Sequence, residues 1–344
     1  MQKSLQYLQC KNGVQQGAVN SGILYAIYFD ELLELLRESG LGCRIYGVFY
    51  GALIFADDII LLSASRNGLQ IMVDMCQNFV ASRNLKFGTN ADPTKSKTKC
   101  ILFTRRNIPM QEVRPIKLDG NDLPWVDSLK HLGHILEKDN SMRLDITQKR
   151  GMFIGKANSL LQEFNNVSRE VFLKVLNNFA TNIYASNLWN IFGKHYDKLF
   201  KSYNVAIRNA LKVDRCTHRY LLEPLSKELH LKTMLCSHFV AFHNSLLSCP
   251  KFPVRFLARL SEGDLRTVHG RNIYEIGQLC NSELELLKPK LVKKNVKYSE
   301  ILRGEAWRIG LCNELLLIRD DEECYVPGFD SDELDCLLRY LCVT

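Results

Sequence analysis

The chain lacks an apolar run long enough to span a membrane. Its longest uninterrupted run, Val48–Ala56, has the length of a strand, whereas a spanning helix needs about 20 apolar residues. No Cys-x-x-Cys pair occurs among the 12 cysteines, and the N-terminus does not have the pattern of a signal peptide. We therefore expect an intracellular protein of the nucleus or cytoplasm with reduced thiols, no membrane partner and no disulfide-linked partner.

Internal repeats and low-complexity segments are also absent, and at 344 residues, 46% of them hydrophobic, the chain can bury a substantial core. Its net charge of +8 is unevenly placed. From Glu314 onward nine acids and two arginines, Arg319 and Arg339, give a net charge of −7. The residues before Glu314 therefore carry a net charge of +15. A basic body with an acidic tail favours a polyanionic partner such as nucleic acid.

The most informative segment is Phe55-Ala56-Asp57-Asp58, which lies between the apolar runs Val48–Ile54 and Ile59–Leu62. Two apolar, β-branched runs around a short polar segment predict two strands joined by a tight turn. At such a reversal two adjacent carboxylates can converge, and Mg²⁺ is the cation that two carboxylates favour. The alternative is that Asp57 and Asp58 are simply good turn residues.

The apolar pattern elsewhere predicts an α+β fold. Helical spacing predicts a helix over 21–39 and a second, amphipathic helix over 65–84. Short strands are predicted at 100–103 and 131–136, and a hairpin at 116–126. The expected architecture is an antiparallel sheet with helices, followed by a part of the chain that is mainly helical.

Beyond about residue 140 long helical patterns dominate. They predict helices over 142–164, 168–192 and 196–211. We expect a mixed helix and sheet domain at 1–137, a helical domain at 138–215 and a helical C-terminal extension with an acidic tail at 216–344. The stretch Lys194–Arg219 carries seven positive and two negative side chains, so it predicts contact with a nucleic-acid backbone, or else an ordinary exposed helix face.

A glycine-rich loop precedes the first predicted helix. In Asn12–Ala18, Gly13 and Gly17 enclose Val14-Gln15-Gln16. Glycines let a backbone approach a ligand closely, and Gln16 can hydrogen-bond a base or a sugar hydroxyl. Taken alone, the loop could equally be a linker.

Together these motifs resemble the reverse transcriptase of non-LTR retrotransposons. The segment Gly13–Tyr25 looks like the family's Gly-Val-Arg-Gln-Gly…Ser-Pro…Leu-Phe segment, and Phe55–Asp58 is similar to its Tyr/Phe-Ala-Asp-Asp hairpin. The pair Asn84–Phe87 and Ser96–Lys99 resembles the next palm segment, and Ser128–Ile135 looks like the primer-grip hairpin. The motifs occur in the family's order over residues 13–135. The resemblance implies that 1–137 is a partial polymerase palm, with an antiparallel sheet and helices, followed by a helical thumb at 138–215 and a helical C-terminal extension at 216–344. From 140 onward the likeness is weak.

The resemblance implies RNA-directed DNA synthesis with an RNA template, a DNA primer and dNTP as partners. Two Mg²⁺ (or Mn²⁺) ions about 4 Å apart would serve phosphoryl transfer. Asp57 would be the principal metal ligand and Asp58 a secondary one or an orienter. The other implied site residues are Gln16, Gly17, Phe55 and Lys97 for nucleotide and template, with Lys97 at the leaving pyrophosphate, and Leu132 and Gly133 for the primer grip.

Two departures from the family pattern bear on activity. Gly22 stands where the family has Pro, which loosens the helix entry. The family also places a further catalytic Asp on a strand before the Gly-Gln-Gly loop, and we expect this chain to lack that strand together with the fingers. Because each hard cation needs about six oxygen ligands, we expect the chain to be inactive alone.

Three hypotheses follow. The chain is a palm and thumb that is active only within a longer or complemented protein, or a catalytically dead relict that still binds RNA or DNA through its basic surface. In the third hypothesis it is a folded remnant without a nucleic-acid role, and its paired acids merely form a turn.

Overall fold

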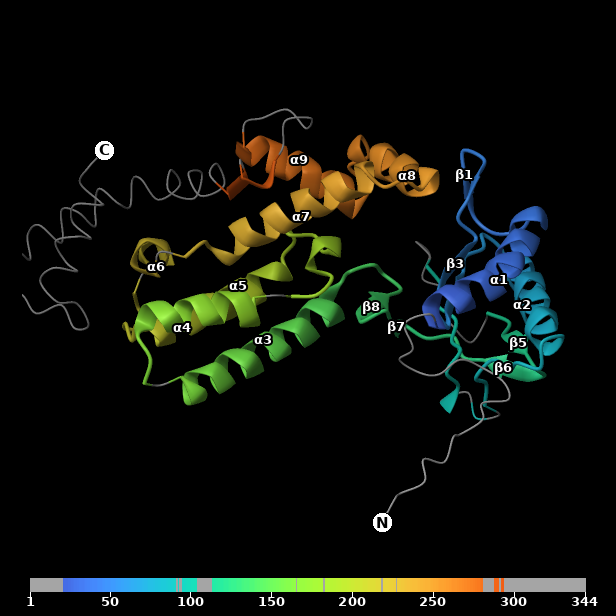
Figure 1. Cartoon of the computed structure of the whole chain (residues 1–344), viewed down its shortest axis with the longest axis horizontal. Helices are drawn as coiled ribbons and strands as arrows, with labels where there is room; N and C mark the ends of the chain where they lie inside the picture. The colour runs from blue at the N-terminus through green and yellow to red at the C-terminus, as the bar shows by residue number, and fades with distance from the viewer. Residues whose placement is uncertain are drawn as a thin grey trace, which may run out of the picture. The chain divides into compact units, whose positions relative to one another are not determined.

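The computed structural model describes residues 21–90, 92, 95–103, 113–164, 166–181, 183–217, 219–226, 228–280, 288–290 and 292–293. Helices and short antiparallel strand pairs alternate early in the chain and helices dominate later, so the fold is α+β, as predicted (Figure 1). The chain divides into two compact units, Met1–Leu129 and Lys130–Thr344. The predicted divisions after residues 137 and 215 stay predictions.

The first unit opens on helix α1 and continues through paired short strands. Its elements are α1 (Ser21–Glu38), β1 (Arg44–Ile45), β2 (Val48–Phe49), β3 (Ala52–Phe55), β4 (Asp58–Leu61), α2 (Arg66–Ala81), β5 (Ile116–Leu118) and β6 (Asn121–Leu123). The helices predicted over 21–39 and 65–84 and the hairpin predicted over 116–126 are confirmed. At 100–103, however, only an isolated bridge from Cys100 to Trp125 forms.

One strand predicted over Val48–Ile54 is in fact two. Residues 48–49 pair with β1, and the next strand starts only at Ala52. Between them Gly51 passes so close to Gly42 that a Cβ on Gly42 would lie 2.8 Å from the Gly51 Cα. Only two glycines allow this approach. The strand therefore breaks where the two backbones meet.

Helices α1 and α2 cover the β3–β4 hairpin with one apolar core. Ser65 caps α2 by accepting a hydrogen bond from the Gly68 N–H at 3.1 Å. The buried residues come from both helices and from β3: Phe29, Leu32, Leu36, Ala52, Met72, Cys76, Phe79 and Val80. Val73 faces a second cluster with β5 and β6. This packing fixes the base of the hairpin and leaves its turn outside the core.

The second unit is mainly helical. Its boundary falls inside β7 (Ser128–His131), which pairs with β8 (His134–Glu137). The elements after β8 are α3 (Arg143–Glu163), α4 (Arg169–Val175), the π-helical turn η3 (Leu176–Ala180), the 3₁₀ turn η4 (Ser186–Leu188), α5 (Tyr196–Leu211), α6 (Arg219–Ser226), α7 (Leu231–Leu247), α8 (Phe252–Glu262) and α9 (Val268–Cys280). The predicted helices 142–164 and 196–211 are confirmed.

The single helix predicted over 168–192 is wrong, because it ends at Ala180. After η3 the chain turns back and buries Trp189 and Ile191 in the core of the unit. Asn272 of α9 holds this segment: its Nδ2 donates to the Trp189 carbonyl at 2.7 Å, and its Oδ1 accepts from the Ile191 N–H at 3.2 Å. Burial of a large indole in this way outweighs local helix propensity.

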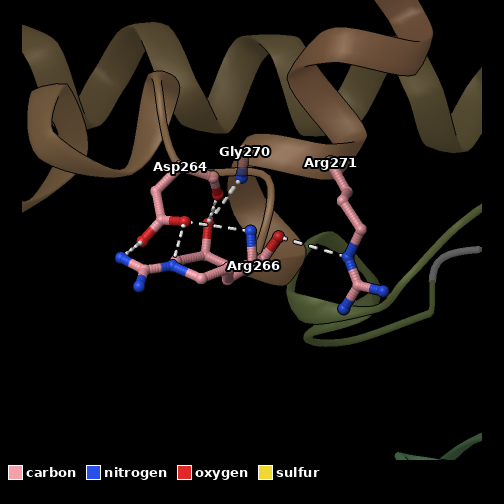
Figure 2. Close-up of polar contacts among 5 residues, drawn as sticks. Asp264, Arg266, Gly270 and Arg271 are labelled. Atoms are coloured by element: carbon pink, nitrogen blue, oxygen red, sulfur yellow. Dashed lines mark hydrogen bonds and ion pairs between the residues drawn. The ribbon is translucent and has the colours of Figure 1, made fainter.

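The turn between α8 and α9 is stabilised by its own polar contacts (Figure 2). The Asp264 carboxylate accepts hydrogen bonds from the Arg266 backbone and guanidinium at 2.8–3.0 Å. Thr267 Oγ1 donates to the Asp264 carbonyl at 2.8 Å and accepts from the Gly270 N–H at 2.9 Å. A Cβ on Gly270 would lie 2.3 Å from the Ser261 carbonyl oxygen, so only glycine permits this crossing of α8 and α9.

Within the described residues, no helix combines the length and apolarity needed to cross a bilayer. The seven cysteines in those residues carry free thiols. The predicted acidic tail from Glu314 onward lies outside the described residues.

Candidate functional site

The paired acids lie at the tip of the β3–β4 hairpin. Phe55 pairs with Asp58 in the antiparallel register, so Ala56 and Asp57 form a two-residue turn. Ala56 has a φ of +49°, in the left-handed region that non-glycine residues rarely occupy. The predicted strand–turn–strand around the acids is therefore confirmed, and its first turn residue is held in a conformation that costs roughly 1 kcal/mol.

Both carboxylates point away from the core. Asp57, Asp58 and the neighbouring Phe55 are exposed, the last by 64%. Within the described part of the chain, no hydrogen bond or ion pair engages either acid. Two adjacent, accessible carboxylates fit a hard cation, since Mg²⁺ in such sites keeps one or two protein carboxylates and completes its shell with water and substrate phosphates.

The hydroxyl of Tyr25, in α1, interacts electrostatically with the carboxylates of Asp57 and Asp58. Burial raises the pKa of its hydroxyl, and the carboxylates of Asp57 and Asp58 raise it further. Its ring stacks on Phe29 with 4.2 Å between centroids. The start of α1 thus borders the acidic turn. Sequence reasoning quoted Tyr25 only as part of a motif, although its spacing from Phe29, Leu32 and Leu36 marks it as part of the helix face toward the core.

The second predicted hairpin is built around Leu132 and Gly133, which join β7 to β8. Their φ angles are +45° and +77°, and two positive values are what a tight hairpin turn of this twist requires. Gly133 adopts a positive φ without strain, whereas Leu132, which is 40% exposed, is strained by it. The hairpin predicted at Ser128–Ile135 is therefore confirmed, with a strained residue at its tip. The single strand predicted over 131–136 is wrong, because the turn at Leu132 and Gly133 interrupts it.

A lysine of helix α3 contacts this turn. Lys149 Nζ donates to the Gly133 carbonyl oxygen at 2.8 Å and lies 5.3 Å from the Tyr184 ring centroid. Asp145, which is fully buried, accepts from the Ile135 N–H at 3.0 Å and from Trp189 Nε1 at 2.7 Å. Two α3 side chains thereby contact the β7–β8 turn, β8, and the segment that contains Tyr184 and Trp189.

The charge state of Asp145 follows from these contacts. Burial raises the pKa of its carboxyl, but the imidazole of His134, whose Nδ1 lies 3.0 Å from Oδ2, together with the Trp189 and Ile135 donors, outweighs burial and holds the pKa below its usual value. Asp145 therefore stays ionised at neutral pH. Sequence reasoning missed Asp145 and Lys149, whose helical spacing carries no sign of their partners.

Residues 1–136 match the protein family described as Reverse transcriptase (RNA-dependent DNA polymerase). A curated relative, the Retrovirus-related Pol polyprotein from type-2 retrotransposable element R2DM of Drosophila melanogaster, is 31% identical over 129 residues. Residues 1–136 are therefore similar to the reverse transcriptase domain of non-LTR retrotransposons. The aligned part makes up 35% of this chain but only 11% of the relative, so the chain spans about a tenth of that protein's length.

All the predicted site residues lie within the matched reverse transcriptase domain. Gln16 and Gly17 are outside the described residues. Lys97 is exposed, and its aliphatic chain lies against Gly88, where a Cβ would come within 3.1 Å of the Lys97 Cδ. No ion pair joins Lys97 to Asp57 or Asp58 in the described chain. The structure therefore brings together Phe55, Asp57 and Asp58, adds Tyr25, and leaves Lys97 unpaired with them.

The acidic turn offers few possible metal ligands. Among the described residues, no cluster of three or more His, Cys, Asp or Glu side chains could hold a metal ion. The turn supplies two carboxylates, and any further oxygen ligands must come from water, substrate or another protein segment. The residues present fit one side of a divalent-cation site.

Proposed function

We propose that this chain contributes the palm of an enzyme that copies RNA into DNA by metal-dependent nucleotidyl transfer. The observation that supports this most strongly is the pair of exposed, unpartnered carboxylates on the β3–β4 turn, within the matched domain. Bound Mg²⁺ (or Mn²⁺) would supply charge neutralisation and activation of the primer 3′-hydroxyl. The protein's own task is to hold ligands, nucleotide and primer in register.

In this proposal Asp57 is the principal metal ligand, because it belongs to the turn itself, and Asp58 is a secondary ligand or an orienter. The exposed ring of Phe55 borders the nucleotide. Lys97 neutralises or protonates the leaving pyrophosphate, and the other proposed contacts are Gln16 and Gly17 for nucleotide and template and Leu132 and Gly133 for the primer.

We further propose that the chain needs a complementing carboxylate segment for activity. Among the described residues, no group of three or more His, Cys, Asp or Glu could hold a metal ion, so the turn offers only its two carboxylates. Two-metal chemistry shares ligands between two cations that each take about six oxygens. Purified chain alone is therefore expected to incorporate no dNTP on a primed RNA template. Steady incorporation by the chain alone would overturn this part of the proposal.

Cation binding tests the acidic turn separately from catalysis. Mg²⁺ should raise the melting temperature of the wild-type chain, because a cation that binds only the folded state stabilises it. Asp57→Asn should abolish that increase and raise the melting temperature without metal by relieving carboxylate repulsion. Asp122→Asn, at an exposed acid of β6, is the matched control and should keep the Mg²⁺ response.

Loss of stability in Asp57→Asn, with an unchanged Mg²⁺ response, would favour a simple turn role and refute the metal site. Recovery of primer extension on adding a segment that supplies a further carboxylate would complete the positive test. Asp57→Asn should block that recovery.

The second candidate function is nucleic-acid binding without catalysis. It is favoured by the basic stretch Lys194–Arg219, much of which lies on α5. If this surface binds a primer–template, the logarithm of the affinity should fall steeply and linearly with the logarithm of salt concentration. Absence of binding at low salt would reject it. An intracellular location is proposed with either function.

A further inference from the structure

The apolar side of helix α8 faces solvent. Phe252, Phe256 and Leu260 recur every four residues and Leu257 lies beside them, so these four residues form one stripe along the helix, the α8 stripe. Phe252 is 56% exposed, Leu257 41% and Leu260 37%. The rings of Phe252 and Phe256 stack with 5.6 Å between their centroids. A contiguous set of exposed apolar side chains indicates an interaction surface, whereas single exposed leucines do not.

Small and polar groups attach α8 to its neighbours. The helix packs on α7 and α9 (Figure 1), and Ala258 is its buried residue. Glu262 Oε1 lies 3.0 Å from His243 Nε2 of α7, and Arg255 Nη1 donates to the Cys249 carbonyl oxygen at 2.8 Å. An amphipathic surface helix ordinarily turns its apolar side toward the core. Helix α8 does the reverse, which leaves the stripe open to a partner.

Positive charge borders the α8 stripe. Arg259 follows Phe252 by seven residues, about two helical turns, so the two lie on the same side of the helix. Lys251 immediately precedes the helix. Both cations are exposed, and within the described residues neither has an acidic partner. The surface therefore fits an apolar segment flanked by acids. It does not fit a second α8 helix, because the cations of two copies would repel each other.

The sequence contains such a segment at 330–341, outside the described residues. Four leucines there have the i, i+3, i+4, i+7 spacing of one helix face. They are Leu334, Leu337, Leu338 and Leu341. The acids around the first leucine are Asp330, Asp332, Glu333 and Asp335. Acids at this end favour the start of a helix, and they complement the cations beside the α8 stripe.

The dimensions of the two parts agree. Phe252 to Leu260 covers about 12 Å of helix, and Leu334 to Leu341 covers about 10 Å. Leu334 follows Lys293, the last described residue, by 41 residues, and a chain of that length reaches up to about 140 Å. Attachment to the same chain raises the local concentration of the segment, so a weak contact is sufficient. The other apolar stretch beyond Lys293, 301–318, has two basic and two acidic side chains and lacks this charge complementarity.

We propose that the α8 stripe is the docking surface for residues 330–341 of the same chain. The segment docks as a helix, its leucines cover the rings of Phe252 and Phe256, and its acids lie beside Lys251 and Arg259. This is the packing of an amphipathic helix on an apolar surface, here within one chain. The inference goes beyond the proposed function and does not depend on the acidic turn.

Hydrogen–deuterium exchange of the full chain tests the docking. Amides of 332–341 should exchange about tenfold or more slowly than in a synthetic peptide of residues 328–344. Leu257→Asp places a charge on the stripe at an exposed position and should remove this protection. Val205→Asp, at a valine in the middle of α5 that is 53% exposed, is the matched control and should leave it unchanged.

Protection that is absent from the wild-type chain, or that survives Leu257→Asp, would overturn the proposal. Loss of protection in Val205→Asp would also overturn it, because the acids would then be held by the basic face of α5.

A second measurement does not depend on the folding of Leu257→Asp. Removal of residues 330–344 should uncover the stripe, so the fluorescence of ANS, a dye that binds exposed apolar surface, should rise about twofold or more. Leu257→Asp in the shortened chain should reduce that rise, and Val205→Asp should not. An ANS signal that truncation leaves unchanged would refute the docking.

Two further outcomes would assign the stripe to another occupant and overturn docking within the chain. Protection that disappears on dilution by about a hundredfold would assign the segment to a second copy. Binding to phosphatidylserine vesicles that Leu257→Asp abolishes and truncation leaves unchanged would assign the stripe to a lipid surface. Asp57→Asn should keep the protection, so failure of the docking and failure of the Mg²⁺ response are seen separately.

Discussion

Lys149 Nζ donates a hydrogen bond to the carbonyl oxygen of Gly133, 2.8 Å away. A buried cation of helix α3 thereby reaches across 16 residues of sequence to hold the tip of the β7–β8 hairpin. Beside it on the same helix, Asp145 holds the first residues of β8. The proposed primer-grip turn is thus positioned from the helical part of the chain, and the following predictions test that support and the conformation of the turn.

Lys149→Met should destabilise the chain by about 1–2 kcal/mol. Methionine keeps the length and apolar volume of the side chain but leaves the Gly133 carbonyl without its charged donor. Urea unfolding measures the change. Lys156→Met is the control, because Lys156 also lies over an aromatic ring, Phe179, but does not contact the hairpin. Equal losses in the two variants would argue against a specific hold on the turn.

Asp145→Asn should destabilise the chain at neutral pH by about 2–3 kcal/mol, because one amide oxygen replaces two carboxylate oxygens that accept from Ile135 and Trp189. The pKa of Asp145 is lowered in the folded state, so its stabilising contribution is present above the ordinary value of 3.8 and is lost as the pH falls through the folded-state pKa.

The gap in unfolding free energy between wild type and Asp145→Asn should therefore be constant near neutrality and shrink below about pH 4. Urea titrations between pH 3 and 7 give the comparison. A gap that widens on acidification would mean that the carboxyl is protonated in the folded chain at higher pH than these contacts allow.

Leu132→Asn should stabilise the hairpin by about 0.5–1 kcal/mol, since asparagine tolerates positive φ far better than a bulky apolar side chain. Leu132 is 40% exposed, so little apolar burial is lost. Leu144→Asn serves as the comparison, because Leu144 is 38% exposed but helical. There the same change should destabilise, and a similar sign at both positions would contradict the strain at the turn.

The buried thiols of the first unit should resist alkylation at pH 8. Burial raises the pKa of Cys76 to about 12 and that of Cys100 to about 11, so almost no reactive thiolate forms at this pH. Among the cysteines that the structure describes, Cys216 is exposed and should be labelled first. Peptide mapping after brief iodoacetamide treatment gives the order. Rapid labelling of Cys76 in the folded chain would show that the α1–α2 core opens readily.

Local pattern predicted several elements well. The helix predicted over 196–211 has the observed bounds of α5. The acidic turn joins the two strands that the apolar runs predicted. In both cases the deciding interactions are between near neighbours: helical periodicity in one, and a two-residue reversal in the other. The acidic hairpin can therefore be predicted from a stretch of about a dozen residues.

Local pattern failed where distant groups meet. The stretch 168–192 has helical spacing, yet it breaks because Trp189 pairs with Asp145 and its carbonyl with Asn272, 44 and 83 residues away. Gly42 and Gly51 similarly break a strand by close contact. The local sequence of neither segment indicates which distant residue it will contact.

The sequence by itself determined the paired acids, their turn, the main helices and the likeness to a reverse transcriptase, since these depend on residue type and short spacing. Only the tertiary structure decided that Tyr25 borders the acids, that Lys149 and Asp145 hold the second hairpin, and that the apolar side of α8 faces solvent. Such pairings arise when whole helices pack, because burial and hydrogen-bond satisfaction are settled over the entire unit rather than along one segment.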